Sequence, residues 1–245
     1  MSFLRHFALA LAFLTRLPIP TGRAEPDDLA ASVRFFPLVG LLLGALLAGL
    51  VAILPARLGP DIVGVLLTGL LALVTGGLHL DGLADVFDAA GGGRGSRERM
   101  LEILRDPRIG AHGATALVLA LIAKVLLLGG CVARRDTASV LLFPVVSRAA
   151  IVPLIVGFGP ARSEGLARAF HQRVGIGELA VTAWIAAIAV AAGGARFVAP
   201  ALAAFAIAGG IGVWMARRLG GLNGDVYGAA LELAEIAFLL AVCCA

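Results

Sequence analysis

Charged residues are scarce in this chain: Asp, Glu, Lys and Arg make up only 15% of its 245 residues, against about 25% in a typical soluble domain. Apolar residues reach 60%, above the soluble average of about 45–50%. These values exclude an ordinary soluble domain and predict an integral membrane protein. Because the apolar runs are about 20 residues long, whereas barrel strands alternate over about 10, we expect the all-α class.

Aromatic residues and cysteines are also few. With aromatics at 6% and arginines scattered between apolar runs, the net charge of +4 gives no reason to expect a nucleic-acid partner. Cys131, Cys243 and Cys244 fit no metal-binding or redox spacing. Arg5 precedes a short apolar stretch, but no small-x-small cleavage site follows, so no signal peptide is predicted.

The long apolar runs predict a polytopic helical bundle with about seven membrane spans. The chain is interpreted as one membrane-embedded domain over 1–245. Residues 3–17, bracketed by Arg5 and Arg16, are predicted as an interfacial or partly inserted helix. The predicted spans are 35–54, 62–80, 112–132, 138–157, 178–193, 198–215 and 229–245.

Arginine distribution predicts the orientation of the bundle. With the N-terminus inside, fourteen arginines fall on inner segments, and Arg57, Arg134, Arg135 and Arg196 on outer ones. The positive-inside rule favours this arrangement. It also places the polar segments 81–111, 158–177 and 216–228 on one face, the cytoplasmic one. The inner arginines are Arg5, Arg16, Arg23, Arg34, Arg94, Arg97, Arg99, Arg105, Arg108, Arg162, Arg168, Arg173, Arg217 and Arg218.

Three aspartates form the most informative pattern in the sequence. Asp81, Asp85 and Asp88 are spaced i, i+4 and i+7, so on a helix the second and third lie about 40° and 20° from the first. Crowded carboxylates raise one another's pKa, and a hard cation such as Mg²⁺ would relieve the repulsion. The alternatives are a solvated helix end and a cation or proton pathway.

An arginine-rich stretch follows these aspartates within the predicted active-site loop, 81–111. Gly91, Gly92 and Gly93 predict a flexible turn, and 97–105 predicts a short amphipathic helix ending before Pro107. Arginine suits phosphate because its donors bind two oxygens at once; lipid headgroups or Glu–Arg pairs are the alternative partners. The arginines are Arg94, Arg97, Arg99, Arg105 and Arg108, and Asp106 is the nearby acid that could face the same site.

Four charges lie within or beside predicted spans: Lys124, Arg148, Glu232 and Glu235. A charge in lipid costs at least about 2.5–3.5 kcal/mol at the bilayer centre, so these side chains are expected to face a cavity or a partner. Asp225 and Glu232 repeat the i, i+7 spacing of the first acidic stripe, and the two acidic pairs could converge across the bundle. Structural ion pairing, for example of Arg148 with Glu232 or Glu235, is the alternative to a substrate role.

Several blocks, in order along most of the chain, resemble the cobalamin synthase family, the adenosylcobinamide-GDP ribazoletransferases. They are FLTRLPIP, FFPLVGLLLG, GGLHLDGLAD, RERMLEILRDPRIGAHG and GLNGDVYGAALELAE. The chain departs from the family pattern in small ways: Ala89 replaces an expected Gly, Pro107 an expected Ser, and Asn223 an expected Thr. Asn can still cap a helix start.

The resemblance implies a Mg²⁺-dependent enzyme of the bacterial inner (cytoplasmic) membrane with its site facing the cytoplasm. It would join adenosylcobinamide-GDP to α-ribazole or its 5′-phosphate and release GMP. A homo-oligomer is compatible with this. The predicted catalytic residues are Asp81, Asp85, Asp88 and Asp106; the metal ligands Asp81, Asp85, Asp88 and Asp225; the substrate-binding residues Arg97, Arg105, Arg108, Arg148, Asn223, Asp225 and Glu232.

Three other functions fit the sequence less well. A CDP-alcohol phosphotransferase also uses an acidic membrane helix and Mg²⁺, but its Asp-Gly-x-x-Ala-Arg opening is absent, because Asp85 follows Ala84. A cation-coupled transporter needs polar groups at several depths, whereas most acids here gather near one face. A non-catalytic membrane scaffold explains the apolar spans but not the acidic stripe.

Overall fold

The computed structural model describes residues 2–55, 57–161 and 173–244. Its regular structure there is helical, and the β-type pairing is an isolated bridge between Pro160 and Leu222. Six helical segments in this part are long and apolar enough to cross a membrane, or seven if the bent pair at 60–92 is one span. The predicted all-α class and polytopic architecture are confirmed.

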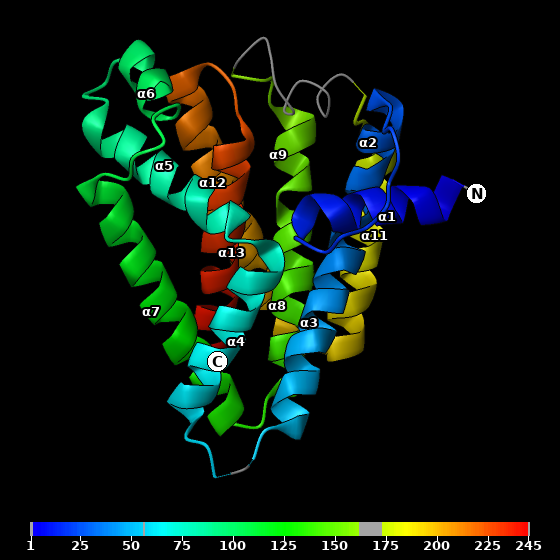
Figure 1. Cartoon of the computed structure of the whole chain (residues 1–245). Helices are drawn as coiled ribbons and strands as arrows, with labels where there is room; N and C mark the ends of the chain where they lie inside the picture. Colours follow the sequence, from blue (N-terminus) through cyan, green and yellow to red (C-terminus); the bar gives the residue numbers. More distant parts are fainter. Residues whose placement is uncertain (1, 56, 162–172, 245) are drawn as a thin grey trace.

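Within the described ranges, seven long helices run along the bundle and match the seven predicted spans (Figure 1). The short helix α9 (Val152–Gly157) continues the fourth of them. Their ends differ from the predicted ones by a few residues. They are α3 (Phe36–Ile53), α4 (Pro60–Thr75), α7 (Ala111–Ala133), α8 (Thr137–Ala150), α11 (Ile176–Gly193), α12 (Val198–Leu219, preceded by η2, Ala195–Phe197) and α13 (Gly224–Cys244).

The N-terminal helix α1 (Ser2–Leu14) lies across the bundle and does not run along α3 (Figure 1). Helix α2 (Pro26–Ser32) and the short η1 (Val33–Phe35) then lead into α3. Arg5 of α1 pairs with Asp28 of α2 at 2.7 Å. This placement suits the predicted interfacial helix, whose contact with lipid stays a prediction.

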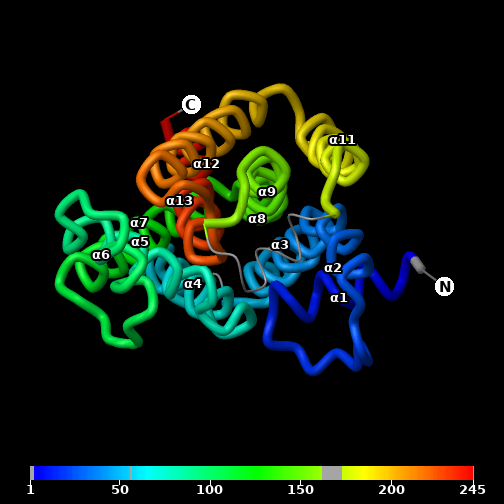
Figure 2. The backbone as a smooth tube through the Cα atoms, turned by 90° about the horizontal axis from the view of Figure 1, so that it is seen from above, coloured from blue at the N-terminus to red at the C-terminus, as the bar shows by residue number. Residues whose placement is uncertain are grey.

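Helices α8 and α9 occupy the middle of the bundle, with α3, α11, α12 and α13 around them (Figure 2). On α3, a Cβ atom at Gly40 or Gly44 would collide with the backbone carbonyls of Pro144 or Leu141 on α8. The two backbones therefore touch directly. Close approach through small residues is how membrane helices gain packing energy without a hydrophobic driving force.

The second predicted span ends earlier than expected, in a sharp bend. Helix α4 stops at Thr75, and Gly76 and Gly77 follow with φ of 64° and 68°, a left-handed conformation that glycine adopts without strain. Helix α5 (Leu78–Gly92) then starts at 92° to α4. It runs obliquely across the end of the bundle that carries α6 (Figure 1), so the helix that bears the aspartates is not one of the long helices along the bundle.

The segment 81–111, predicted as the active-site loop, is mostly helical. Residues up to Gly92 belong to α5, and the short helix predicted over 97–105 is present as α6 (Arg97–Ile103). Gly91 and Gly92 complete the last turn of α5 instead of forming a flexible loop. The alanines before them favour helix, which continues until Gly93 and the left-handed Arg94.

The described parts of the polar segments expected on one face, 81–111, 158–161, 173–177 and 216–228, lie at one end of the bundle (Figure 1). There Ala161 N–H donates to Leu222 O at 2.8 Å, and Leu222 N–H donates to Gly159 O at 2.9 Å. These bonds join the segment after α9 to the turn between α12 and α13. Arg162 and Arg168, predicted on this face, lie outside the described residues.

Candidate active site

Helices α5 and α13 cross at their closest where both carry glycine. A Cβ atom on Gly82 would lie 2.7 Å from the backbone oxygen of Asp225 and 3.0 Å from its Cα. A Cβ atom on Gly228 would lie 3.1 Å from His79 Cα. The start of α13 therefore rests directly on the first two turns of α5, which places Asp225 beside the aspartate stripe.

The resulting group of carboxylates is electrostatically crowded. Asp81 is exposed, while Asp85 and Asp225 are partly buried. Partial burial, together with the charges of Asp225, Asp81 and Asp88, raises the pKa of Asp85 to about 7. Asp225 contributes most of the three neighbours, so the predicted convergence of the two acidic helices is confirmed for this residue. A bound cation would relieve this repulsion.

Asn223 fixes the start of α13. Its side-chain oxygen accepts from Val226 N–H at 3.2 Å, and its amide nitrogen donates to Asp225 Oδ2 at 2.6 Å. The first contact caps the helix, as expected for Asn at this position. The second orients the Asp225 carboxylate, so Asn223 has a positioning role in the site.

Asp88 faces the start of α7. Its two oxygens accept hydrogen bonds from Gly110 N–H at 2.6 Å and Gly113 N–H at 2.8 Å, and only 8% of the residue is exposed. The N–H groups of a first helical turn have no partner within the helix, and an anion there also meets the positive end of the helix dipole. In this structure Asp88 joins α5 to α7.

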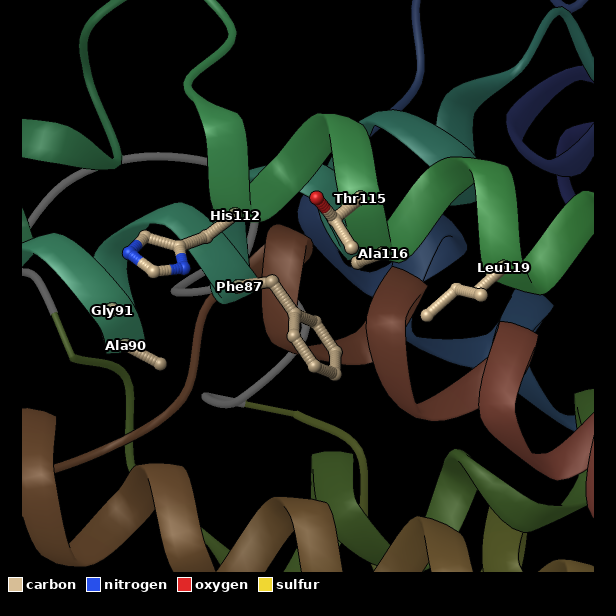
Figure 3. A pocket seen from close by; sticks show the side chains of 7 residues that line it. All are labelled: Phe87, Ala90, Gly91, His112, Thr115, Ala116 and Leu119. Atoms are coloured by element: carbon tan, nitrogen blue, oxygen red, sulfur yellow. The ribbon is translucent and has the colours of Figure 1, made fainter.

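A cavity of about 410 Å³ opens beside this joint, between α5 and α7 (Figure 3). His112 and Thr115 supply its polar groups, and Phe87 its aromatic ring. Figure 3 shows Phe87 projecting from α5 below the first turns of α7. The remaining lining residues are Ala90, Gly91, Ala116 and Leu119.

The predicted phosphate-binding arginines are not equivalent. Arg97 Nε donates to Leu219 O at 2.7 Å and its Nη2 to Ala161 O at 3.3 Å, so this side chain ties α6 to the end of α12. Arg108 donates to both oxygens of Asp106, at 2.9 and 2.6 Å. Arg105 is exposed near the same end of the bundle.

Asp106 is poorly suited to accept a proton. The hydrogen bonds from Arg108 stabilise its charged form and lower its pKa to about 2. Its predicted catalytic role has no support from this geometry. Asp85 is the carboxylate of α5 whose pKa the charge of Asp225 on α13 helps to raise.

Arg148 and Glu232 are buried in the interior of the bundle. Arg148 pairs with Glu235, and Lys124 with Glu232. Structural ion pairing, one of the two interpretations of these charges, is what the structure contains. Neither side chain is placed beside the aspartate stripe.

Sequence reasoning gave no site role to Arg16, which lies at the α4–α5 bend. Its N–H donates to Val74 O at 2.7 Å, and its side chain lies against Gly76. This contact connects the end of α1 to the turn that aims α5. Two features of the sequence could have indicated this contact: an arginine just before the proline-rich LPIP segment and a Gly-Gly pair before the three aspartates.

Asp85 and Asp225 carry oxygen donors of the kind that Mg²⁺ prefers, and Asp81 is a further carboxylate on α5. In the described part of the chain, no three His, Cys, Asp or Glu side chains already lie close enough to hold one metal ion. This does not conflict with a Mg²⁺ site, since that ion is usually bound by one or two carboxylates plus substrate phosphates and water.

Comparison with known proteins gives a consistent family. The family model described as cobalamin-5-phosphate synthase matches residues 6–243. A protein of Geotalea daltonii named adenosylcobinamide-GDP ribazoletransferase is 41% identical over 242 residues, covering 97% of this chain and 96% of the relative. One of the same name from Klebsiella pneumoniae (strain ATCC 700721) is 38% identical over 245 residues, covering 98% and 99%. No solved structure matches this chain.

The match extends over nearly the whole chain and includes the acidic stripe, the arginine-rich segment and the start of α13. This chain therefore belongs to the cobalamin-5-phosphate synthase family.

Proposed function

We propose that this chain joins adenosylcobinamide-GDP to α-ribazole or its 5′-phosphate, releasing GMP. The observation that carries the proposal is the contact between α5 and α13 at one end of a membrane bundle. It packs the Asp225 backbone on Gly82, and the charge of Asp225 helps to raise the pKa of Asp85. The names of the relatives supply the substrate class. The carboxylates can bind a divalent cation that neutralises a diphosphate substrate.

Mg²⁺ would be held by Asp85 and Asp225, with Asp81 completing the set. The donor set fits, because these are oxygen ligands and their mutual repulsion favours a cation. When bound, Mg²⁺ would neutralise the diphosphate and the departing phosphate. Asp88 is left out of this set because two backbone N–H groups already bind its oxygens.

The reaction is an in-line displacement at the phosphorus attached to cobinamide. The ribose 3′-hydroxyl oxygen of the acceptor forms a new bond to this phosphorus, and the bond from phosphorus to the oxygen of GMP breaks. One of the carboxylates Asp81 and Asp85 accepts the hydroxyl proton. Exposed Arg105 is the arginine best placed to meet the phosphates, because the donors of Arg97 and Arg108 are engaged within the protein.

The site is proposed to face the cytoplasm of a bacterial inner membrane. This orientation rests on the arginine excess at the end of the bundle that carries the carboxylates. Both phosphorylated substrates would then reach the site from water without crossing the apolar spans. This chemistry does not require two copies of the chain to associate.

The test uses the full chain, purified and reconstituted in liposomes, with adenosylcobinamide-GDP, α-ribazole 5′-phosphate and Mg²⁺. GMP should appear only when both substrates are present. Asp81→Asn should reduce its release at least a hundred-fold while the protein still inserts and folds. Asp61→Asn, at the opposite end of α4, is the matched control and should behave as the unaltered chain. GMP release that ignores the acceptor, or full activity in Asp81→Asn, would contradict the proposal.

A further inference from the structure

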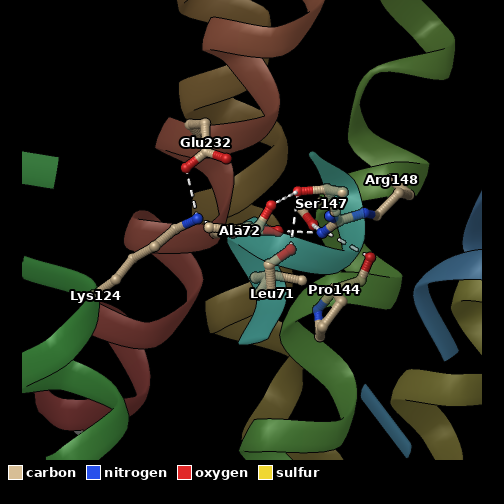
Figure 4. Close-up of polar contacts among 9 residues, drawn as sticks. Leu71, Ala72, Lys124, Pro144, Ser147, Arg148 and Glu232 are labelled. Atoms are coloured by element: carbon tan, nitrogen blue, oxygen red, sulfur yellow. Dashed lines mark hydrogen bonds and ion pairs between the residues drawn. The ribbon is translucent and has the colours of Figure 1, made fainter. Parts of the chain in front are cut away.

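Four charged side chains meet inside the bundle and form the buried quartet: Lys124, Arg148, Glu232 and Glu235. Figure 4 labels Lys124, Arg148 and Glu232. Lys124 Nζ lies 2.5 Å from Glu232 Oε2 and also pairs with Glu235, which in turn pairs with Arg148. Between 0 and 4% of each residue is exposed. Two positive and two negative charges are thus enclosed and balanced.

Three separate helices supply the quartet, and each charge lies near the middle of its helix. Lys124 comes from α7 (Ala111–Ala133) and Arg148 from the α8–α9 segment (137–157). Both carboxylates come from α13 (Gly224–Cys244). Arg148 is also held by Ser147 Oγ, 3.1 Å from its Nη1. Placing four charges at mid-depth is costly unless they are paired, so the arrangement demands a reason beyond filling space.

The reason we infer lies in the geometry of α13. Asp225 and Glu232 are seven residues apart, which on a helix places them on nearly the same face and about 10 Å apart along the axis. A rotation of α13 that moved Glu232 away from Lys124 would therefore also turn Asp225 away from α5. The ion pairs of the quartet and the position of Asp225 in the candidate metal site therefore both depend on the rotation of α13.

Packing constrains that orientation in part. Between the two acids, α13 buries the small residues Gly228, Ala229 and Ala230 and the larger Val226, Tyr227 and Leu231. The small side chains let neighbouring helices approach closely, and the apolar contacts of the larger ones are not directional. Ion pairs to two neighbouring helices are directional, and they add a specific restraint, as buried polar groups do when they fix the register of coiled coils.

We propose that the buried quartet sets the rotation and axial position of α13, so that Asp225 faces Asp85. Its members are positioning residues, since they act through Asp225 and do not touch substrate. The role in catalysis rests on the proposed function, whereas the role in placing α13 does not.

Two variants separate positioning from mere stability. Lys124→Met leaves buried carboxylates short of a partner, so it should fold poorly. The double variant Lys124→Met/Glu232→Met removes a whole ion pair, keeps similar volumes and leaves Arg148 paired with Glu235. Replacing a complete buried pair by apolar side chains is often neutral or stabilising, so this variant should fold while losing the restraint.

The direct measurement is the distance between spin labels on α5 and α13. Cysteines at Leu78 and Gly224, both exposed, carry the labels in full-length protein whose native cysteines are replaced by alanine. The unaltered quartet should give one narrow distance distribution, and the double variant a broader or shifted one. Arg196→Met, which removes a surface pair with Asp136 at 2.9 Å, is the matched control and should leave the distribution narrow.

The kinetic measurement is the Mg²⁺ concentration for half-maximal GMP release. The double variant should raise it at least five-fold, because Asp225 no longer meets its partners, while the thermal midpoint stays near that of the unaltered chain. An unchanged distance distribution and unchanged Mg²⁺ response would overturn the proposal. So would failure of the double variant to fold, since the quartet would then be required for folding itself. Absence of GMP release by the unaltered chain would count against the proposed function instead, and the distance measurement would still decide the role of the quartet.

Discussion

Asp88 gives the sharpest contrast between a ligand and a structural carboxylate. Its two oxygens accept from Gly110 N–H and Gly113 N–H at 2.6 and 2.8 Å, where the residue is almost fully buried. Replacing it by alanine would leave both donors without a partner. An unsatisfied buried donor costs about 1–3 kcal/mol, and one of these N–H groups is only partly buried, so the expected loss is about 2–4 kcal/mol.

That loss converts to a measurable shift in thermal stability. For chains of 150–250 residues, each kcal/mol lowers the thermal midpoint by about 2–4 °C, so Asp88→Ala should melt roughly 4–16 °C below the unaltered chain in detergent. Asp88→Asn keeps one acceptor oxygen and should lose about half as much.

Asp85→Asn is the matched comparison. It removes a charge that its carboxylate neighbours destabilise, so its thermal midpoint should stay the same or rise while GMP release falls at least a hundred-fold. The reasoning is refuted if Asp88→Asn melts like the unaltered chain and yet loses Mg²⁺-dependent turnover, because Asp88 would then act as a ligand.

Three further predictions follow from the same contacts. Gly82→Ala places a Cβ atom 2.7 Å from Asp225 O, so its GMP release should fall at least ten-fold. The control Gly69→Ala places a Cβ atom with no other atom within 4 Å, so its GMP release should stay near normal. Equal GMP release by the two variants would contradict the α5–α13 contact. Arg97→Ala loses hydrogen bonds to two backbone carbonyls. The free energy of unfolding should fall by about 1–3 kcal/mol, so the thermal midpoint in detergent should drop by a few degrees. An unchanged midpoint would mean that these bonds do not stabilise the fold. Chelation with EDTA should stop GMP release and excess Mg²⁺ should restore it; turnover that persists in EDTA would argue against a metal.

Much of the fold follows from local sequence properties. Long apolar runs determine where helices cross a membrane, and all seven predicted spans coincide with helices. The i, i+4, i+7 aspartates do lie on one helix, α5. Asn223 caps α13, as its side-chain chemistry predicts.

The errors come from tertiary contacts that spacing does not encode. Hydropathy continues through Gly76 and Gly77, so it did not indicate the 92° bend that separates α4 from α5. The helical spacing predicted that Asp88 binds metal together with Asp81 and Asp85. Instead, two N–H groups at the start of α7 donate hydrogen bonds to its oxygens. Likewise Glu232 lies on the same face of α13 as Asp225, but its carboxylate pairs with Lys124 inside the bundle and not with a group on α5.

The central claim is that α5 and α13 together form a Mg²⁺-dependent site. The most direct measurement is a Mg²⁺ titration of GMP release by Asp225→Asn, beside the control Asp61→Asn. We expect Asp225→Asn to need at least ten times more Mg²⁺ for half-maximal release, or to release none, while Asp61→Asn follows the unaltered chain. Identical titration curves for Asp225→Asn and the unaltered chain would contradict it.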